Sequence, residues 1–180
     1  NSMAGYSHYI QWVVTVFMLL FGVNFNAYYL ILFLDVKKAF KIEEVKWYFT
    51  IILLSAFVIF TDLMQFYPSL GDAVRDSFFQ VATIITTTGF ATADFNTWSA
   101  TSKTTLVLLM FIGACAGSTG GGLKVSRLMI LVKTIFKELT SYLHPKSIVK
   151  IKMDDKPIEH EVVRSANVYF ITYMIIFVVS

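Results

Sequence analysis

The sequence predicts an all-α integral membrane fold in which one short helix enters the membrane and returns on the same side. Three observations predict this fold. Of the 180 residues, 56% are hydrophobic and only 15% are charged, whereas soluble domains carry about a quarter charged residues. The apolar helical stretch at residues 72–85 is too short to cross a bilayer. A glycine-rich run also interrupts a later apolar stretch of spanning length.

Two predicted spans precede the short helix. Residues 9–34 contain no charge, and a helix of this length extends about 39 Å, enough to cross the membrane with some tilt. Asn24 and Asn26 lie inside this span, and we expect one of them to hydrogen-bond a neighbouring helix. The polar residues 35–46 follow. Residues 47–67 then form a second span with aromatic residues at both ends.

The later elements follow a different pattern. Pro68 and Gly71 mark a turn before the short helix, which has the length of a re-entrant helix. After the polar residues 86–103, the apolar stretches 104–115 and 123–143 read as one spanning helix, broken at residues 113–122, where five of ten residues are glycine. Such a break is tolerated in a membrane only where the backbone is buried in protein or lines water. The charged residues 146–164 lead into a further apolar stretch at residues 162–180.

The distribution of basic residues supports a re-entrant short helix. Of the fifteen Lys and Arg residues, four lie in residues 35–46 and nine lie in residues 124–164. These two groups fall on one side of the membrane, the cytoplasmic side, only if the short helix does not cross it.

A threonine-rich loop, Thr86-Thr87-Thr88-Gly89-Phe90, follows the short helix. A helix C-terminus carries about half a negative charge, and the carbonyl groups of residues 86–89 can replace the water around a dehydrated cation. Gly89 permits a backbone conformation that other residues rarely adopt. We therefore expect a monovalent cation to bind at Thr87, Thr88 and Gly89. The alternative is an ordinary polar surface loop.

Four stretches resemble a known family: Asp76-Ser77-Phe78-Phe79-Gln80, the loop at residues 86–90, Ala93-Asp94-Phe95, and the run AGSTGGGLKV at residues 116–125. They are similar to the TrkH family of bacterial potassium uptake subunits, whose superfamily also contains the Ktr and plant HKT transporters. The resemblance implies a fold related to potassium channels, with four helix–pore loop–helix repeats around one pore. It makes residues 9–34 the last helix of one repeat, residues 47–143 a complete repeat, and residues 162–180 the start of the next. We therefore expect residues 1–180 to be one piece of the membrane domain of a longer protein.

The resemblance also assigns a gate. In the family, the broken middle of this helix forms an intramembrane loop that obstructs the pore below the filter, and Gly117, Ser118, Thr119, Gly120, Gly121 and Gly122 match that loop. Consecutive glycines disfavour a helix by about 1 kcal/mol each relative to alanine. The alternative is a packing hinge between neighbouring helices. Lys124 either lies near the ion path, where it repels cations, or anchors the helix at the cytoplasmic surface.

Partners and location follow from the same resemblance. It implies a homodimer with several spans in the plasma (inner) membrane of a bacterium, controlled by a cytosolic nucleotide-binding ring protein of the TrkA type. The basic residues 137–164 would contact that protein or the anionic lipid of the bilayer. We expect no cofactor, with K⁺ as the transported ion. The net charge of +3 is too small to indicate nucleic acid.

Two other functions compete with potassium uptake. The loop has one glycine, where potassium channel loops carry two, so a Na⁺-conducting member of the same superfamily is one alternative. The other is a non-conducting membrane scaffold, in which the glycine run packs against another helix. We do not expect an enzyme: the sequence has no nucleophile–base pair, and Leu123 stands where a phosphate-binding loop requires lysine. The single cysteine, Cys115, excludes an internal disulfide.

Overall fold

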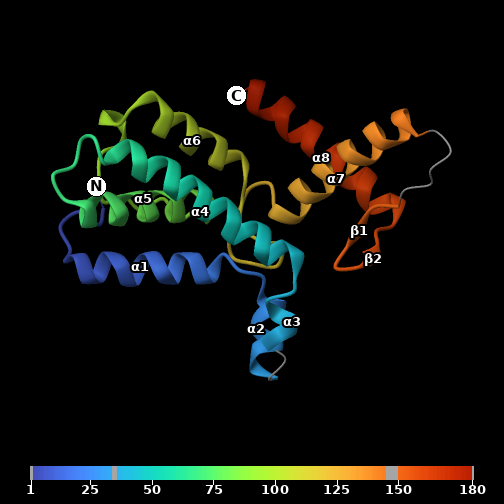
Figure 1. Ribbon diagram of the computed structural model, residues 1–180, viewed down its shortest axis with the longest axis horizontal. Coiled ribbons are helices and arrows are strands. Elements are labelled where there is room, and N and C mark those ends of the chain that lie inside the picture. The colour runs from blue at the N-terminus through green and yellow to red at the C-terminus, as the bar shows by residue number, and fades with distance from the viewer. Residues whose placement is uncertain (1, 34–35, 145–149, 180) are drawn as a thin grey trace. The chain divides into compact units, whose positions relative to one another are not determined.

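The computed structural model describes residues 2–33, 36–144 and 150–179. The described chain is predominantly helical, as the sequence predicts, and it divides into two compact units, residues 1–125 and 126–180 (Figure 1). The sequence alone grouped residues 1–180 as one membrane domain. The division falls at Val125, the first residue after the glycine-rich region to become helical again.

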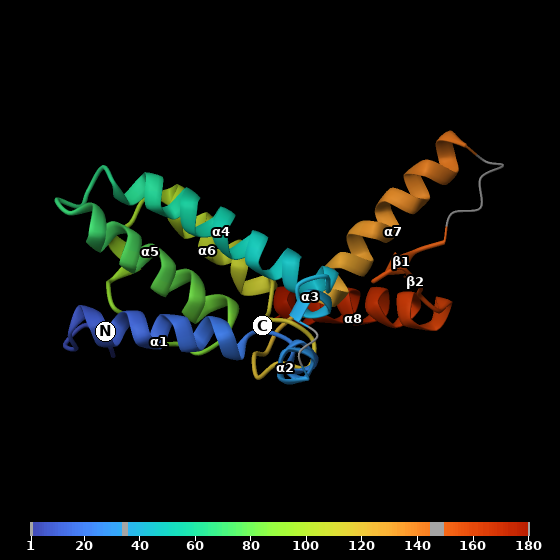
Figure 2. The same cartoon turned by 60° about the horizontal axis from the view of Figure 1, so that its bottom comes forward.

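Three helices of the first unit pack around a fourth. Helix α5 (Leu70–Ile85) contacts α1 (His8–Phe21), α4 (Glu43–Leu63) and α6 (Ala100–Phe111). Figure 2 shows α5 between α1 on one side and α4 with α6 on the other. Phe79 and Ile85 of α5 are fully buried. The short helix of the sequence analysis is therefore the central element of this unit.

Helices α1 and α2 (Phe25–Leu32) meet at an angle of 93°, so the prediction of one continuous helix over residues 9–34 is wrong. Gly22 ends α1, and the side chain of Asn24 caps α2 by accepting a hydrogen bond of 2.8 Å from the N–H of Asn26. Glycine is frequent in membrane helices, so the pattern gave no sign of the bend. The predicted end of the span, Leu34, lies outside the described residues.

Helix α4 confirms the second predicted span, because its 21 residues are long and apolar enough to cross a membrane. It begins four residues earlier than predicted, since Glu43 and Glu44 lie in its first turn, where negative charge is favourable. The short helix α3 (Val36–Ala39) packs against α2 in the preceding polar stretch. At its other end, α4 stops at Leu63.

Helices α6 and α7 (Val125–Leu143) confirm the predicted break between two apolar helical stretches. Helix α6 begins after Ser99, whose hydroxyl accepts from the N–H of Ser102 at 3.4 Å. It ends at Phe111 rather than at Cys115 as predicted, because Ile112 has extended backbone and forms a parallel bridge with Leu123. The break is therefore longer than the glycine run.

The second unit contains the rest of α7, a short hairpin and α8 (His160–Val179). Strands β1 (Lys152–Met153) and β2 (Lys156–Pro157) pair antiparallel within the predicted charged stretch. Helix α8 confirms the last predicted span, with 20 residues that are long and apolar enough to cross a membrane. The guanidinium of Arg127 on α7 lies 4.1 Å from the ring centroid of Tyr169 on α8. The last residue of the predicted span, Ser180, lies outside the described residues.

Candidate functional site

The threonine loop begins directly at the C-terminus of α5. Backbone N–H groups of Thr86, Thr87 and Thr88 donate to the carbonyls of the last turn of α5, at 3.1, 3.0 and 2.9 Å. These hydrogen bonds satisfy carbonyls that the end of a helix otherwise leaves without a partner. The donors of the loop are therefore used within the first unit.

The carbonyl oxygens of the same loop are free. Within residues 2–33, 36–144 and 150–179, no hydrogen bond uses the carbonyl oxygen of Thr86, Thr87, Thr88 or Gly89 as its acceptor. Thr86 is 7% exposed, and the next four residues, to Phe90, are exposed. Free carbonyls beside the negative end of a helix dipole are suited to replace the hydration shell of a monovalent cation.

Two residues of this loop have a left-handed backbone. The sequence predicts this conformation for Gly89, and a φ of +82° confirms it. Thr87, with a φ of +57°, was not anticipated. A β-branched residue with positive φ is a genuine outlier, and such strain, of about 1–3 kcal/mol, clusters at functional sites.

Side-chain hydroxyls and one carboxylate fix the loop to α5. The hydroxyl of Thr86 donates to a carbonyl one turn earlier in α5 at 2.6 Å and lies 2.8 Å from the hydroxyl of Thr88. Beyond the loop, the hydroxyl of Thr92 donates to Oδ1 of Asp76 at 3.1 Å. Asp76 is 3% exposed and also accepts from Nε of Arg75 at 3.0 Å. Both ends of the loop are therefore held by the helix that precedes it.

The glycine-rich segment, defined here as residues 113–124, forms a loop closed at its base. The N–H of Gly113 donates to the carbonyl of Leu123 at 2.6 Å, and the N–H of Val125 donates to the carbonyl of Ala114 at 3.2 Å. These two hydrogen bonds join the residues that enter and leave the segment. All six glycine-run residues matched to the family's gate lie inside this closed loop: Gly117, Ser118, Thr119, Gly120, Gly121 and Gly122.

This segment contacts the threonine loop directly. The N–H of Gly121 donates to the hydroxyl of Thr87 at 2.9 Å. Gly120 is buried, and a Cβ added to it would lie 3.3 Å from the carbonyl oxygen of Thr86. The ammonium of Lys124 donates to the carbonyl of Gly120, so the charged end of this side chain contacts the glycine-rich segment. The structure thus brings the predicted filter residues and the predicted gate residues together.

The other side of the segment contacts the bend between α1 and α2. The N–H of Cys115 donates to the carbonyl of Gly22 at 3.0 Å, and the N–H of Phe25 donates to the carbonyl of Gly117 at 3.1 Å. The hydroxyl of Thr119 donates to the carbonyl of the last residue of α1 at 3.3 Å. The bend therefore supplies the backbone groups against which the segment rests, a role that sequence reasoning did not predict.

A buried carboxylate, Glu44, lies between these two breaks. Its Oε2 accepts from the side-chain amide of Asn24 at 3.2 Å, and its Oε1 accepts from the N–H of Ala116 at 2.6 Å. Glu44 is 4% exposed. The Asn24 contact confirms the expected hydrogen bond between this region and a neighbouring helix. Sequence reasoning missed Glu44, although a carboxylate at the start of an apolar span is a signal that could have identified it.

An open groove of about 470 Å³ runs along α1 beside the threonine loop. Phe17 and Phe21 of α1 line one part of it, and Thr88, Phe90 and Thr119 line another. Residues predicted for the filter and one residue predicted for the gate therefore border the same space. Among the described residues, no group of three or more His, Cys, Asp or Glu side chains is arranged to hold a metal ion.

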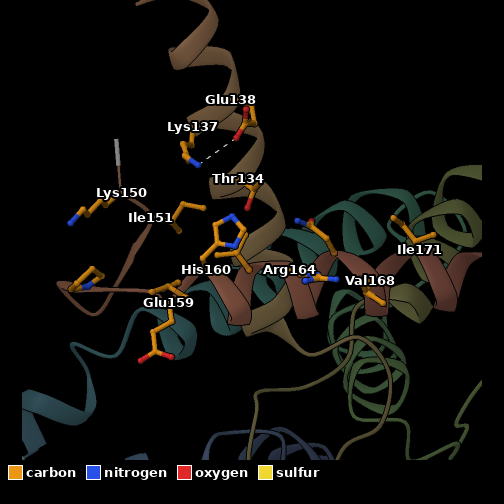
Figure 3. A pocket seen from close by; sticks show the side chains of 14 residues that line it. Thr134, Lys137, Glu138, Lys150, Ile151, Glu159, His160, Arg164, Val168 and Ile171 are labelled. Carbon is orange, nitrogen blue, oxygen red and sulfur yellow. Dashed lines mark ion pairs between the residues drawn. The ribbon is translucent and has the colours of Figure 1, made fainter. Parts of the chain in front are cut away.

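The second unit has a pocket of its own, of about 650 Å³ (Figure 3). The basic side chains of Lys137, His160 and Arg164 line it, and so do acidic ones. Lys137 forms an ion pair of 3.5 Å with Glu138. The pocket therefore includes part of the basic stretch for which contacts with a protein or with lipid were predicted, together with residues on either side of that stretch.

Comparison with known proteins gives consistent matches over nearly the whole chain. A family model described as "TrkH: Cation transport protein" matches residues 1–180. The chain is 33% identical over 178 residues to the "Trk system potassium uptake protein TrkH" of Vibrio parahaemolyticus, which covers 96% of this chain and 37% of that protein. It is 30% identical over 176 residues to the protein of the same name from Escherichia coli K12, covering 95% of this chain and 36% of that protein.

A solved structure agrees with these matches. The crystal structure of the potassium transporter TrkH from Vibrio parahaemolyticus superposes with a TM-score of 0.90 at 33% identity, covering 99% of this chain and 39% of that one. The fold is therefore that of an all-α membrane protein. The chain spans just over a third of the length of the relatives that it matches.

Proposed function

Because the chain belongs to the TrkH family of cation transport proteins, we propose that it is the part of a potassium uptake transporter that carries one filter loop and the gate beneath it. One observation carries this proposal. The carbonyl oxygens of residues 86–89 have no hydrogen-bond donors among the described residues, and they follow directly on the C-terminus of the buried helix α5. A cation is the natural partner for such a group of oxygens.

In this proposal, selection takes place at the threonine loop. The carbonyls of Thr87, Thr88 and Gly89 coordinate K⁺, and the dipole of α5 lowers the energy of a cation there. A complete filter requires several such loops around one axis. The exposure of Thr88 and Phe90 supports this, because residues left open here would face equivalent loops in the remainder of the protein.

Gating is assigned to the glycine-rich segment. Its hydrogen bond to Thr87 supports this assignment, because it joins the segment to the loop proposed to select the ion. The segment is also closed at its base, so in this proposal it would move as one piece. The ammonium of Lys124, bound to Gly120, would repel cations that approach the closed segment. Passive flux would follow the electrochemical gradient when the segment is displaced.

The family's setting completes the proposal. We infer that the full-length protein lies in the inner membrane of a bacterium as a homodimer, and that a cytosolic nucleotide-binding ring protein of the TrkA type controls the segment. The basic pocket with Lys137, His160 and Arg164 is the surface that we assign to that protein or to anionic lipid.

The alternatives make different predictions at the same residues. A Na⁺-conducting member would use the same carbonyls with weaker discrimination, which the single glycine of the loop favours. A non-conducting scaffold requires the glycine run to pack against a helix. Here the run contacts a loop, at Thr87, and the helix ends that flank a bend, at Phe21 and Phe25, which favours the conducting function.

The test is ion flux into liposomes that contain the full-length protein. We expect uptake of Rb⁺ to exceed that of Na⁺, and we expect Gly89→Ser to abolish Rb⁺ uptake or its selectivity. Gly89 has room for a side chain but a φ of +82°, so the substitution acts through the backbone. Gly5→Ser is the matched control, because a Cβ at Gly5 also meets open space and no positive φ accompanies it.

Each outcome decides between the functions. Rb⁺ uptake lost in Gly89→Ser and kept in Gly5→Ser supports a filter at this loop. Equal uptake of Na⁺ and Rb⁺ by the unmodified protein supports the Na⁺-conducting alternative. Uptake no greater than that of empty liposomes, with folded protein and the regulator present, overturns the proposal in favour of the scaffold.

A further inference from the structure

The strongest unexplained feature of the first unit is that one buried carboxylate connects two breaks in helices. Glu44 lies in the first turn of α4 and is 4% exposed. Its two oxygens accept hydrogen bonds from Asn24 in the bend between α1 and α2 and from Ala116 in the glycine-rich segment. These partners are 20 and 72 residues away in the sequence. Burying a carboxylate costs free energy unless the group is hydrogen-bonded. The two hydrogen bonds therefore help to explain why Glu44 can be buried here.

The hydrogen-bond network fixes the orientation of the Asn24 amide. Its Oδ1 accepts from the N–H of Asn26 at 2.8 Å, so its Nδ2 is the atom that donates to Glu44. Ala116 contributes a backbone donor, at 2.6 Å, that no side-chain substitution removes. The acceptor of both hydrogen bonds is a carboxylate, and hydrogen bonds to an ionised acceptor are about twice as strong as neutral ones.

We infer that Glu44 is a positioning residue that holds the glycine-rich segment against the α1–α2 bend, and that this hold keeps the segment under the filter when the pore is closed. The second part of the inference rests on the proposed function; the first does not. Ala116 lies between Cys115, which donates to the carbonyl of Gly22, and Gly117, which accepts from the N–H of Phe25. Releasing Ala116 would therefore loosen the segment where it contacts the α1–α2 bend.

Cys115 provides a direct measure of this hold. It is the single cysteine of the chain, it is fully buried, and it is adjacent to Ala116. The measurement is the rate at which N-ethylmaleimide modifies Cys115 in the purified full-length protein, with cysteines outside this region replaced by serine. Rb⁺ flux into liposomes without the regulator is measured on the same preparations.

Exchanging the donor and the acceptor between residues 24 and 44 tests this hydrogen bond specifically. The double variant restores the contact, whereas a general loss of protein stability would not be reversed by a second substitution. Glu44→Gln alone sets two amide donors against each other, and Asn24→Asp alone sets two carboxylates against each other. The double variant Asn24→Asp with Glu44→Gln restores one donor and one acceptor. Lys46→Gln, at an exposed residue two positions further along the same helix, is the matched control.

We expect each single variant to raise the modification rate of Cys115 about tenfold, which corresponds to about 1.4 kcal/mol. The double variant should return to within about twofold of the unmodified protein, and Lys46→Gln should not change the rate. The inference that Glu44 holds the segment would be overturned by either of two results. One is an unchanged rate of Cys115 modification in Glu44→Gln, and the other is a double variant that is modified as fast as the single variants.

The flux measurement tests the second part of the inference separately. A rise in regulator-free Rb⁺ flux in Glu44→Gln, reversed in the double variant, supports restraint of the gate. If the protein without substitutions conducts, and Glu44→Gln speeds the modification of Cys115 without raising Rb⁺ flux, then Glu44 does not restrain the gate. If the unmodified protein does not conduct under any condition, the proposed function fails, and the modification rates still decide whether Glu44 holds the segment.

Discussion

The backbone N–H of Gly121 donates a hydrogen bond of 2.9 Å to the side-chain hydroxyl of Thr87. One partner belongs to the loop proposed to select the ion, and the other belongs to the segment proposed to gate it. The acceptor residue is also the threonine that has a φ of +57°. This contact links the strained backbone of one loop to the position of the other, and it gives the first prediction.

Thr87→Val should release Gly121 while keeping a β-branched side chain at residue 87. The valine offers no acceptor, so we expect the amide of Gly121 to exchange with deuterium about fivefold faster, as for a bond that contributes about 1 kcal/mol. Hydrogen exchange followed by mass spectrometry measures this. Thr87→Ser keeps the hydroxyl and should exchange at the original rate; equal rates in all three proteins would contradict the contact.

Gly120→Ala should impair the packing of the segment, and a second change should repair part of the damage. An added Cβ would lie 2.7 Å from the Cβ of Ala114 and 3.3 Å from the carbonyl oxygen of Thr86. We expect a loss of about 1–3 kcal/mol, as for other overpacked sites, measured by thermal unfolding in detergent. Ala114→Gly removes the nearer atom, so the double variant should recover part of the melting temperature. A double variant less stable than Gly120→Ala would show that the clash lies elsewhere.

Asp62→Ala should separate the end of α4 from the start of α6. The Oδ2 of Asp62 accepts from the hydroxyl of Ser99 at 2.5 Å and from the hydroxyl of Ser102, which is fully buried. The lost acceptor leaves a buried donor without a partner, at a cost of about 1–3 kcal/mol. The melting temperature should fall accordingly. Asp155→Asn, at an exposed turn residue, is the control that should leave it unchanged.

Thr83→Val should stabilise the first unit. Thr83 is 2% exposed, and its hydroxyl has no hydrogen-bond partner in the part of the chain that the structure describes. A methyl group of the same shape removes a buried polar atom, so we expect a gain of about 1 kcal/mol. Thr86→Val should have the opposite sign, because that hydroxyl donates at 2.6 Å to the carbonyl of Ala82. Equilibrium unfolding of both variants checks the two signs; the same sign in both would contradict the assignment.

Local features of the site were predictable from the sequence. The short helix, the glycine-rich break and the backbone of Gly89 each depend on a few consecutive residues, and the structure confirms them, with a helix of 16 residues rather than the predicted 14. The candidate filter and gate residues lie in two contiguous runs, so the sequence could also name them as candidates. That Thr87 and Gly121 touch could not be deduced, because no local pattern encodes a contact between residues 34 positions apart.

Other features depend on contacts between distant parts of the chain. The bend after α1 forms hydrogen bonds with two residues far away in the sequence, Cys115 and Gly117. Likewise, the hydrogen bond that Glu44 accepts from Ala116 joins two residues that are 72 positions apart. A pattern of apolar residues reports which segments are helical, but it does not report which backbone groups those segments leave for one another.

The contact between Glu44 and Ala116 also has a consequence for biosynthesis. Ala116 leaves the ribosome 72 residues after Glu44, which at 5–20 residues per second takes roughly 4–14 seconds. During that interval, Asn24 and Glu44 have both been synthesised, but Ala116 and the rest of the glycine-rich segment have not. The hydrogen bond from Ala116 to Glu44 therefore forms late in the synthesis of the first unit, which ends at Val125. In the proposed function, the segment that docks late is also the one that later has to move.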